Sequence, residues 1–275
     1  MPAEVGSIQN APAMSDVKFA VVGAGAVGGY YAARLAHAGF DVALIARGAH
    51  LDAIRARGLW VWSPLGDLVV HPRATANPAD VGPVDVVLYA VKTYDNDTAL
   101  PLLMPLLKAD TIIVTLQNGV SSAADVGKVV GVDRVLAGPT YIATALKAPG
   151  LIEQTGVHRR IVFGEVHRPE ATPSARVTAL AELLRAADIQ AEPVADARVP
   201  LWEKFIYLAP FAAVTGAARQ PAGVVWSTPA LRATLEAAFD ETEAVARAEG
   251  VAVSSDVHDR VRGYMDALPA GTRSS

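Results

Sequence analysis

Residues 18–47 read KFAVVGAGAVGGYYAARLAHAGFDVALIAR, and this order predicts a strand, a tight turn, a helix and a second strand. The run KFAVV is apolar, which is typical of a strand that is buried on both faces. In the G-x-G-x-x-G pattern that follows, Gly23 permits the sharp turn, Gly25 lets the backbone approach a pyrophosphate, and Gly28 lets the helix lie close to the strand. The helix then directs its N-terminal N–H groups at the phosphates. We therefore expect a dinucleotide-binding loop made of Gly23, Ala24, Gly25, Ala26, Val27 and Gly28.

The residue at the end of the second strand indicates which dinucleotide binds. Sites for NAD usually carry Asp or Glu about twenty residues after the glycine motif, where the carboxylate binds the ribose 2′-hydroxyl. Arg47 occupies this place here, and the nearest acidic residue is Asp52. A guanidinium suits the 2′-phosphate of NADP through charge-assisted hydrogen bonds, so the sequence favours NADP(H). The alternative is that Arg47 is only a solvated loop residue.

The composition excludes several classes of protein. A chain of 275 residues is long enough for two domains, and its hydrophobic content of 52% includes no run of membrane-spanning length. The net charge of −4 and the lack of a basic cluster give no case for nucleic acid, and the lack of cysteine excludes thiolate chemistry. The six histidines do not have the spacing of metal ligands, so no metal site is expected. We expect a cytoplasmic enzyme with neither membrane nor nucleic-acid partners, and a homodimer is one possible assembly.

The pattern of elements divides the chain into two domains. Residues 1–16 lack the features of a signal peptide and are expected to be a disordered extension, with a wrongly assigned start site as the alternative. Strand and helix signals alternate over residues 17–195, including a helix at about 96–107, whereas residues 196–275 read as helices. Pro210 is expected to bend or interrupt the first of these helices, and Thr228 and Pro229 begin a long amphipathic helix that ends before Gly250.

Three polar residues stand in apolar surroundings where chemistry is expected. Lys92 and Asn118 each follow a buried strand, at the edge where doubly wound sheets bind ligands, although a solvated strand end and an ordinary turn residue are the alternatives. Lys204 lies in an otherwise apolar helix, where desolvation lowers the pKa of an ammonium toward the range useful for acid–base work. The alternative is a lysine that reaches solvent and pairs with Glu203 or Asp196.

These stretches together resemble the ketopantoate reductases, which are NADPH-dependent 2-dehydropantoate 2-reductases of pantothenate biosynthesis. The resemblance rests on the glycine motif with its following strand, on VKTYD, TLQNGV and LWEKF, and runs from Lys18 to the end of the chain. It implies an α/β fold, with an N-terminal Rossmann-like NADP-binding domain followed by an all-helical C-terminal substrate and catalytic domain. Lys204 would be the general acid and would contact the substrate. Arg47 would contact the 2′-phosphate, Lys92 and Asn118 would line the cofactor and substrate cleft, and Ser274 would lie beside the substrate carboxylate.

Two features depart from the family pattern. The family's reductases commonly carry asparagines four and eight residues after the lysine, where this chain has Leu208 and Ala212. The family also continues past the Ser274-Ser275 pair, so the helical domain is expected to be truncated. The sequence therefore predicts NADPH-dependent reduction of a 2-keto acid, with 2-dehydropantoate as the leading substrate. A reductase of a different keto acid and a non-catalytic NADP-binding regulatory protein are the alternatives.

Overall fold

The computed structural model describes residues 16–273, and its contacts divide the chain into two compact units. The first unit comprises Met1–Val114, Tyr141–Ile161 and Ala179–Ala191, and the second comprises Thr115–Thr140, Val162–Thr178 and Glu192–Ser275. The extension expected at residues 1–16 lies, apart from its last residue, outside the described part. The domain boundary that we place between residues 195 and 196 remains a prediction.

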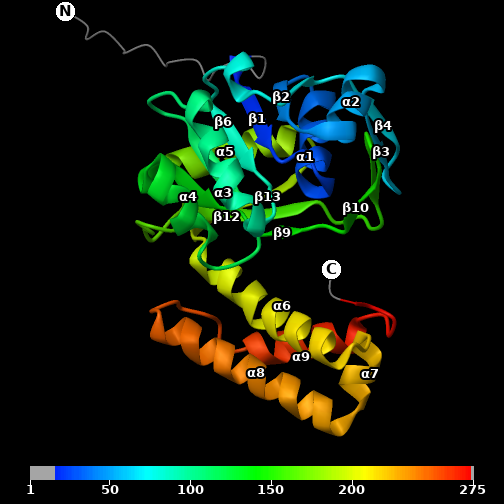
Figure 1. Cartoon of the computed structure of the whole chain (residues 1–275). Helices are drawn as coiled ribbons and strands as arrows, with labels where there is room; N and C mark the ends of the chain where they lie inside the picture. Colours follow the sequence, from blue (N-terminus) through cyan, green and yellow to red (C-terminus); the bar gives the residue numbers. More distant parts are fainter. Residues whose placement is uncertain (1–15, 274–275) are drawn as a thin grey trace, which may run out of the picture. The chain divides into compact units, whose positions relative to one another are not determined.

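A parallel sheet in the first unit carries the glycine motif. Five strands of this sheet, β1 (Lys18–Val22), β2 (Asp41–Ile45), β5 (Arg73–Thr75), β6 (Val86–Tyr89) and β7 (Ile112–Thr115), are neighbours in the order β7-β6-β1-β2-β5. Strand β1 pairs in parallel with both β2 and β6, and the side chains of Phe19, Val21 and Val22 are almost completely buried. Helix α1 (Ala26–His37) connects β1 to β2, followed by α2 (Gly48–Arg57) (Figure 1). The strand–turn–helix–strand prediction is therefore confirmed.

A second, four-stranded sheet in the first unit packs against α1. Its strands are β3 (Leu59–Trp62), β4 (Leu68–Val70), β10 (Thr144–Ala148) and β11 (Leu151–Gln154), in the order β10-β11-β3-β4. Helix α1 approaches this sheet so closely that a Cβ atom on Gly29 would lie 2.4 Å from the side chain of Ile152. The tip of the β10–β11 hairpin is the turn at Pro149 and Gly150, and it becomes part of the candidate site.

The second unit contains a group of helices near the C-terminal end of the sequence. Helices α6 (Arg198–Ala218), α7 (Ala222–Ser227), α8 (Pro229–Ala248) and α9 (Val257–Ala267) pack together (Figure 1). Their shared core includes Ile206, Phe211, Leu235, Phe239 and Met265. The long helix predicted after Thr228 is confirmed as α8, with Thr228 as its N-cap and Pro229 at the first helical position.

The remaining elements complete the chain. They are the strands β8 (Val135–Ala137), β9 (Thr140–Tyr141), β12 (Arg160–Glu165) and β13 (Gln190–Asp196), the α-helices α3 (Asn96–Ala99), α4 (Ser122–Val130) and α5 (Ala175–Ala186), and the short 3₁₀ helices η2 (Pro78–Asp80), η3 (Thr93–Asp95), η4 (Leu100–Leu106) and η5 (Val132–Arg134). Strand β12 pairs antiparallel with β8, where Gly164 faces Ala137.

Two differences from the sequence-based expectation occur at prolines. The helix expected at residues 96–107 is α-helical only over α3 and continues as the 3₁₀ helix η4, because Pro101 and Pro105 have no N–H to donate to the helix. The interruption expected at Pro210 does not occur, since α6 runs through this residue. The burial of Ile206, Phe211 and Val214 in the helical core offsets the lost hydrogen bond there.

Candidate active site

The glycine loop has the close packing that its sequence pattern predicts. Gly23 directly follows β1 and has a φ of +95°, and a Cβ atom there would lie 2.8 Å from backbone atoms of Ala90 and Val91. A Cβ atom on Gly28 would lie 2.2 Å from the carbonyl oxygen of Gly23. Only glycine therefore allows α1 to start this close to the strand end.

Gly25 has the opposite environment, because a Cβ atom built on it would have no neighbour within 4 Å. Gly25 is the N-cap of α1, a helix of 12 residues whose first turn contains no acidic residue. Unpaired N–H groups and the positive end of the helix dipole favour an anion at such an N-terminus. The open space at Gly25 and the tight packing at Gly23 and Gly28 thus fit the pyrophosphate of a dinucleotide.

Arg47 lies where the sequence predicts a contact with a 2′-phosphate. It follows β2 and is the N-cap of α2, and its side chain is 79% exposed. Its guanidinium Nη2 donates a hydrogen bond of 3.3 Å to Oδ1 of Asp95, a residue that the sequence analysis did not single out. Asp95 comes three residues after Lys92, and its place after the strand adjacent to β1 is the signal that could have identified it.

Lys92 is exposed and follows β6, as the N-cap of η3. Strands β1, β2 and β6 are parallel neighbours, so their carboxyl ends share one edge of the sheet. The structure therefore brings Lys92, Arg47 and the glycine loop to the same edge of the first unit. The cofactor-binding roles of these residues remain predictions.

His50, in the first turn of α2, contacts the backbone of the glycine loop. Its Nε2 lies 2.6 Å from the carbonyl oxygen of Ala24, and the backbone N–H of Gly150 donates a hydrogen bond of 2.9 Å to its Nδ1. This contact of His50 is absent from the sequence-based expectations, which concern the histidines only as metal ligands. No sequence signal points to it, because Gly150 is 100 residues away in the chain.

Lys204 and Asn118 meet in the second unit. Lys204 lies in α6, and its Nζ donates hydrogen bonds of 2.9 Å to Oδ1 of Asn118 and of 2.7 Å to the carbonyl oxygen of Thr140. Asn118 stands in the turn after β7, where Gly119 has a φ of +109°. Asn118 therefore lies in a turn, as the alternative reading of the sequence expects, and its side chain also contacts Lys204.

Burial determines the acid–base character of Lys204. Desolvation of the ammonium lowers the pKa of Lys204 to about 8, although both of its oxygen partners favour the charged form. Such a group is largely protonated near neutral pH and gives up its proton more readily than an ordinary lysine. The alternative partner considered from the sequence, Glu203, is instead paired with Arg260, and Asp196 is paired with Arg198.

The helix face beside Lys204 is apolar. Leu208 and Ala212 follow Lys204 by four and eight residues in α6, and residues at this spacing lie on one face of a helix. Both are partly buried. Ser274, which the resemblance places beside the substrate carboxylate, lies outside the described residues, so its role remains a prediction.

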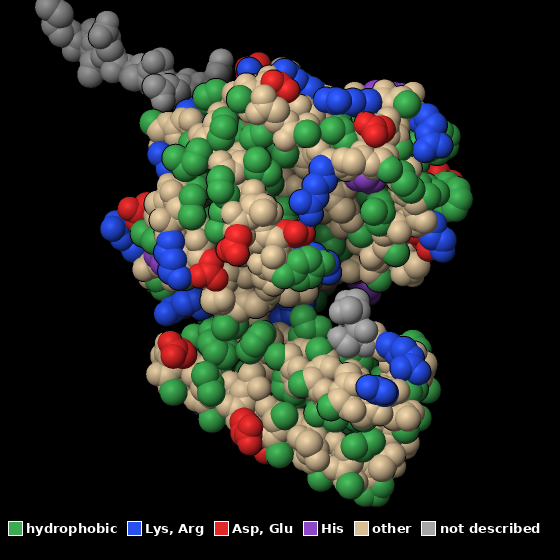
Figure 2. Space-filling model, in the orientation of Figure 1, with side chains coloured by type: hydrophobic (Ala, Val, Ile, Leu, Met, Phe, Trp, Pro, Cys, Tyr) green, Lys and Arg blue, Asp and Glu red, His purple; other side chains and the backbone are tan. Residues whose placement is uncertain are grey.

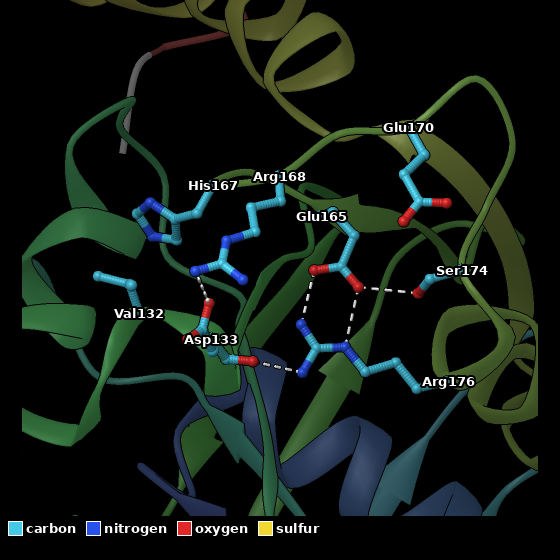
Figure 3. Close-up of a pocket in the computed structure, with 8 residues that line it drawn as sticks. All are labelled: Val132, Asp133, Glu165, His167, Arg168, Glu170, Ser174 and Arg176. Atoms are coloured by element: carbon cyan, nitrogen blue, oxygen red, sulfur yellow. Dashed lines mark hydrogen bonds and ion pairs between the residues drawn. The ribbon is translucent and has the colours of Figure 1, made fainter.

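A polar pocket of about 250 Å³ in the second unit is separate from these residues (Figure 3). Glu165 accepts hydrogen bonds from Arg176 (2.8 and 2.6 Å) and from the hydroxyl of Ser174 (2.8 Å). Burial alone would raise the pKa of Glu165, but these hydrogen bonds hold it below its usual value. The charges of Glu165 and Arg176 at the centre of the pocket therefore neutralise each other, and we assign no catalytic role to this pocket.

The described residues show neither a transmembrane helix nor a metal cluster. No helix within residues 16–273 is both long and apolar enough to cross a membrane. The same part of the chain holds no group of three or more His, Asp or Glu side chains arranged to bind a metal ion. Acidic and basic side chains are interspersed on the face shown in Figure 2. The absence of nucleic-acid partners remains a prediction.

Family models match both parts of the chain. Residues 19–168 match the model described as "Ketopantoate reductase PanE/ApbA", and residues 196–275 match its C-terminal counterpart. A 2-dehydropantoate 2-reductase from Mesorhizobium japonicum is 34% identical over 274 aligned residues, covering 91% of this chain and 82% of the relative. An uncharacterized oxidoreductase of Bacillus subtilis is 28% identical, with 94% and 84% covered.

Solved structures confirm the predicted fold class. A PanE/ApbA family ketopantoate reductase from Ralstonia eutropha superposes with a TM-score of 0.85 at 32% identity, covering 94% of this chain and 83% of that one. A D-mandelate dehydrogenase is similar with a TM-score of 0.83 at 19% identity, over 94% and 83% of the two chains, and shows the fold alone. The α/β sheet domain and the helical C-terminal domain therefore match the fold of the ketopantoate reductase structure.

Proposed function

The chain belongs to the ketopantoate reductase family and is an oxidoreductase that uses a nicotinamide dinucleotide, and we propose that it reduces a 2-keto acid with NADPH. The leading substrate is 2-dehydropantoate, which is the substrate named for several relatives. The observation that carries this proposal is the partly buried Lys204, whose ammonium is held by Asn118 and by the Thr140 carbonyl and whose pKa is lowered to about 8. Pantothenate biosynthesis, a cytoplasmic location and a homodimer remain predictions.

The residues of the first unit fit NADPH. When bound, this cofactor supplies a hydride to the substrate's carbonyl carbon. The open N-terminus of α1 at Gly25 would hold the pyrophosphate. The exposed guanidinium of Arg47 would bind the 2′-phosphate, and Lys92 would add positive charge for the cofactor or the substrate carboxylate. The expected preference is therefore for NADPH over NADH.

Lys204 would supply the proton of the reaction. As the carbonyl oxygen of the substrate gains negative charge, Nζ of Lys204 donates a proton to it, and the neutral amine then recovers a proton from solvent. Before transfer, the ammonium stabilises the developing alkoxide electrostatically. The hydrogen bonds to Asn118 and to the Thr140 carbonyl fix the position of Nζ, and the Asn118 side chain would also help to orient the substrate.

Leu208 and Ala212 favour a second candidate, a reductase of a different keto acid. These residues occupy the helix positions where the family resemblance leads us to expect amide side chains. Aliphatic side chains cannot donate hydrogen bonds to a hydroxyl group such as that of 2-dehydropantoate. A 2-keto acid with an apolar side chain would suit this face better.

A steady-state panel tests the proposal. NADPH oxidation would be followed with 2-dehydropantoate and with 2-keto acids that carry small, branched and aromatic side chains. Turnover with NADPH, and weaker turnover with NADH, is the expected result, and the preferred acid identifies the substrate. Tight NADPH binding without turnover of any acid would contradict the enzymatic role and favour a regulatory NADP-binding protein. Equal use of NADH would contradict the cofactor assignment.

A further inference from the structure

The hydrogen bonds of the two ring nitrogens of His50 indicate its tautomer. A backbone N–H can only donate, so Nδ1 of His50 must be the acceptor of the hydrogen bond from Gly150. The proton of the neutral ring is then on Nε2, which donates to the carbonyl oxygen of Ala24. The two contacts therefore fit the tautomer that carries its proton on Nε2.

The bond to Ala24 also orients the neighbouring peptide. In a trans peptide unit the carbonyl oxygen and the following N–H point in opposite directions. The Ala24 carbonyl points at His50, so the N–H of Gly25 points away from it. The Ala24–Gly25 peptide can rotate easily, because glycine allows many backbone conformations. A rotated peptide would present a carbonyl oxygen, instead of an N–H, to a bound anion. His50 opposes this rotation.

Gly150 gives His50 a fixed support. It has a φ of +77° at the tip of the β10–β11 hairpin, and its carbonyl accepts a hydrogen bond of 2.9 Å from the N–H of Trp60. The guanidinium of Arg57 donates a hydrogen bond of 3.2 Å to the carbonyl of Pro149 beside it. A Cβ atom on Gly150 would lie 3.0 Å from Cβ of Ala53 in α2, so the hairpin tip is packed against the helix that carries His50.

We propose that His50 is a positioning residue for the cofactor, which holds the Ala24–Gly25 peptide with its N–H available to the dinucleotide phosphates. This role rests on one part of the proposed function only, namely that the glycine loop binds a dinucleotide. It acts on the part of the cofactor that NADPH and NADH share, whereas Arg47 acts on the 2′-phosphate alone. Loss of the His50 contact should therefore weaken both dinucleotides by the same factor.

Three substitutions separate the two hydrogen bonds. His50→Ala removes both, His50→Gln keeps an N–H donor of suitable reach for the Ala24 carbonyl, and His50→Asn keeps an acceptor near the position of Nδ1 for Gly150. His37→Gln is the matched control, because His37 is exposed at the end of α1. Each variant would be titrated with NADPH and with NADH, and its thermal unfolding would be recorded.

The expected result is that His50→Ala raises the Kd of both dinucleotides about tenfold, the loss typical of one or two hydrogen bonds. His50→Gln should recover most of this loss and His50→Asn little of it, at similar unfolding temperatures, while the His37 control stays unchanged. Unchanged Kd values in His50→Ala, a loss confined to NADPH, or equal behaviour of the Gln and Asn variants would overturn the role of His50. If the wild-type chain binds dinucleotide but reduces no keto acid, the proposed function fails while this binding test still decides on His50. A wild-type chain that binds neither dinucleotide overturns both.

Discussion

The pH dependence of the reduction follows directly from the environment of Lys204. A general acid acts in its protonated form, so the rate of reduction should fall as the pH rises through the pKa of this group. Desolvation lowers the pKa of Lys204 to about 8. With that value, about 90% of the enzyme carries the proton at pH 7 and about 10% at pH 9, whereas an ordinary lysine with a pKa of about 10.4 would still be about 95% protonated at pH 9.

The predicted profile is therefore a fall of kcat/KM by roughly a factor of ten between pH 7 and pH 9. Initial rates of NADPH oxidation would be measured from about pH 6 to about pH 10 at saturating NADPH, with the Kd of NADPH determined at each pH as a control. Lys204→Arg is a second control, because a guanidinium remains protonated throughout and a weakly active variant should lose the step near pH 8. A wild-type profile that stays flat up to pH 10 would refute the assignment of a desolvated general acid.

Other substitutions test the cofactor side of the site. Arg47→Ala should raise the Kd of NADPH about 10- to 100-fold, since it removes a charged hydrogen-bond donor, and should leave NADH within about twofold; an equal loss for both would contradict the 2′-phosphate contact. Asp95→Asn should strengthen NADPH binding by up to about fivefold, because it removes the carboxylate that pairs with Arg47 at 3.3 Å, and weaker binding would show that Asp95 supports the site instead. Gly28→Ala should lower the stability by about 1–3 kcal/mol in denaturant unfolding, because its Cβ would lie 2.2 Å from the Gly23 carbonyl. Gly25→Ala places a Cβ with no neighbour within 4 Å, so this variant should keep native stability and still bind dinucleotide less well. Equal stability of Gly25→Ala and Gly28→Ala in denaturant would contradict this difference in packing.

The cofactor loop could be predicted from the sequence because its physics is local. Gly23 and Gly28 are needed within a few residues of one another, and the apolar strand before them fixes which edge of the sheet they occupy. The same local reasoning placed Arg47 and Lys92 at strand ends. The lowered pKa of Lys204 was also foreseeable, since a lysine in a strongly apolar helix must be desolvated.

The partners of these residues could not be predicted in the same way. Thr140 contacts Lys204 through its backbone carbonyl, so its side chain carries no signal of the role. His50 depends on Gly150, a residue that the chain brings near only after 100 further residues. Of the two outcomes expected at Pro210, the interruption does not occur, because long-range packing in the helical core keeps α6 continuous through the proline.

The central claim is that Lys204 is the proton donor of a dinucleotide-dependent reduction, and one comparison tests it most directly. The measurement is kcat/KM for the preferred 2-keto acid in the wild type and in Lys204→Ala, with the Kd of NADPH determined for both proteins. We predict that kcat/KM falls by about two to four orders of magnitude while NADPH still binds with nearly native affinity. Near-native turnover by the alanine variant would contradict the claim.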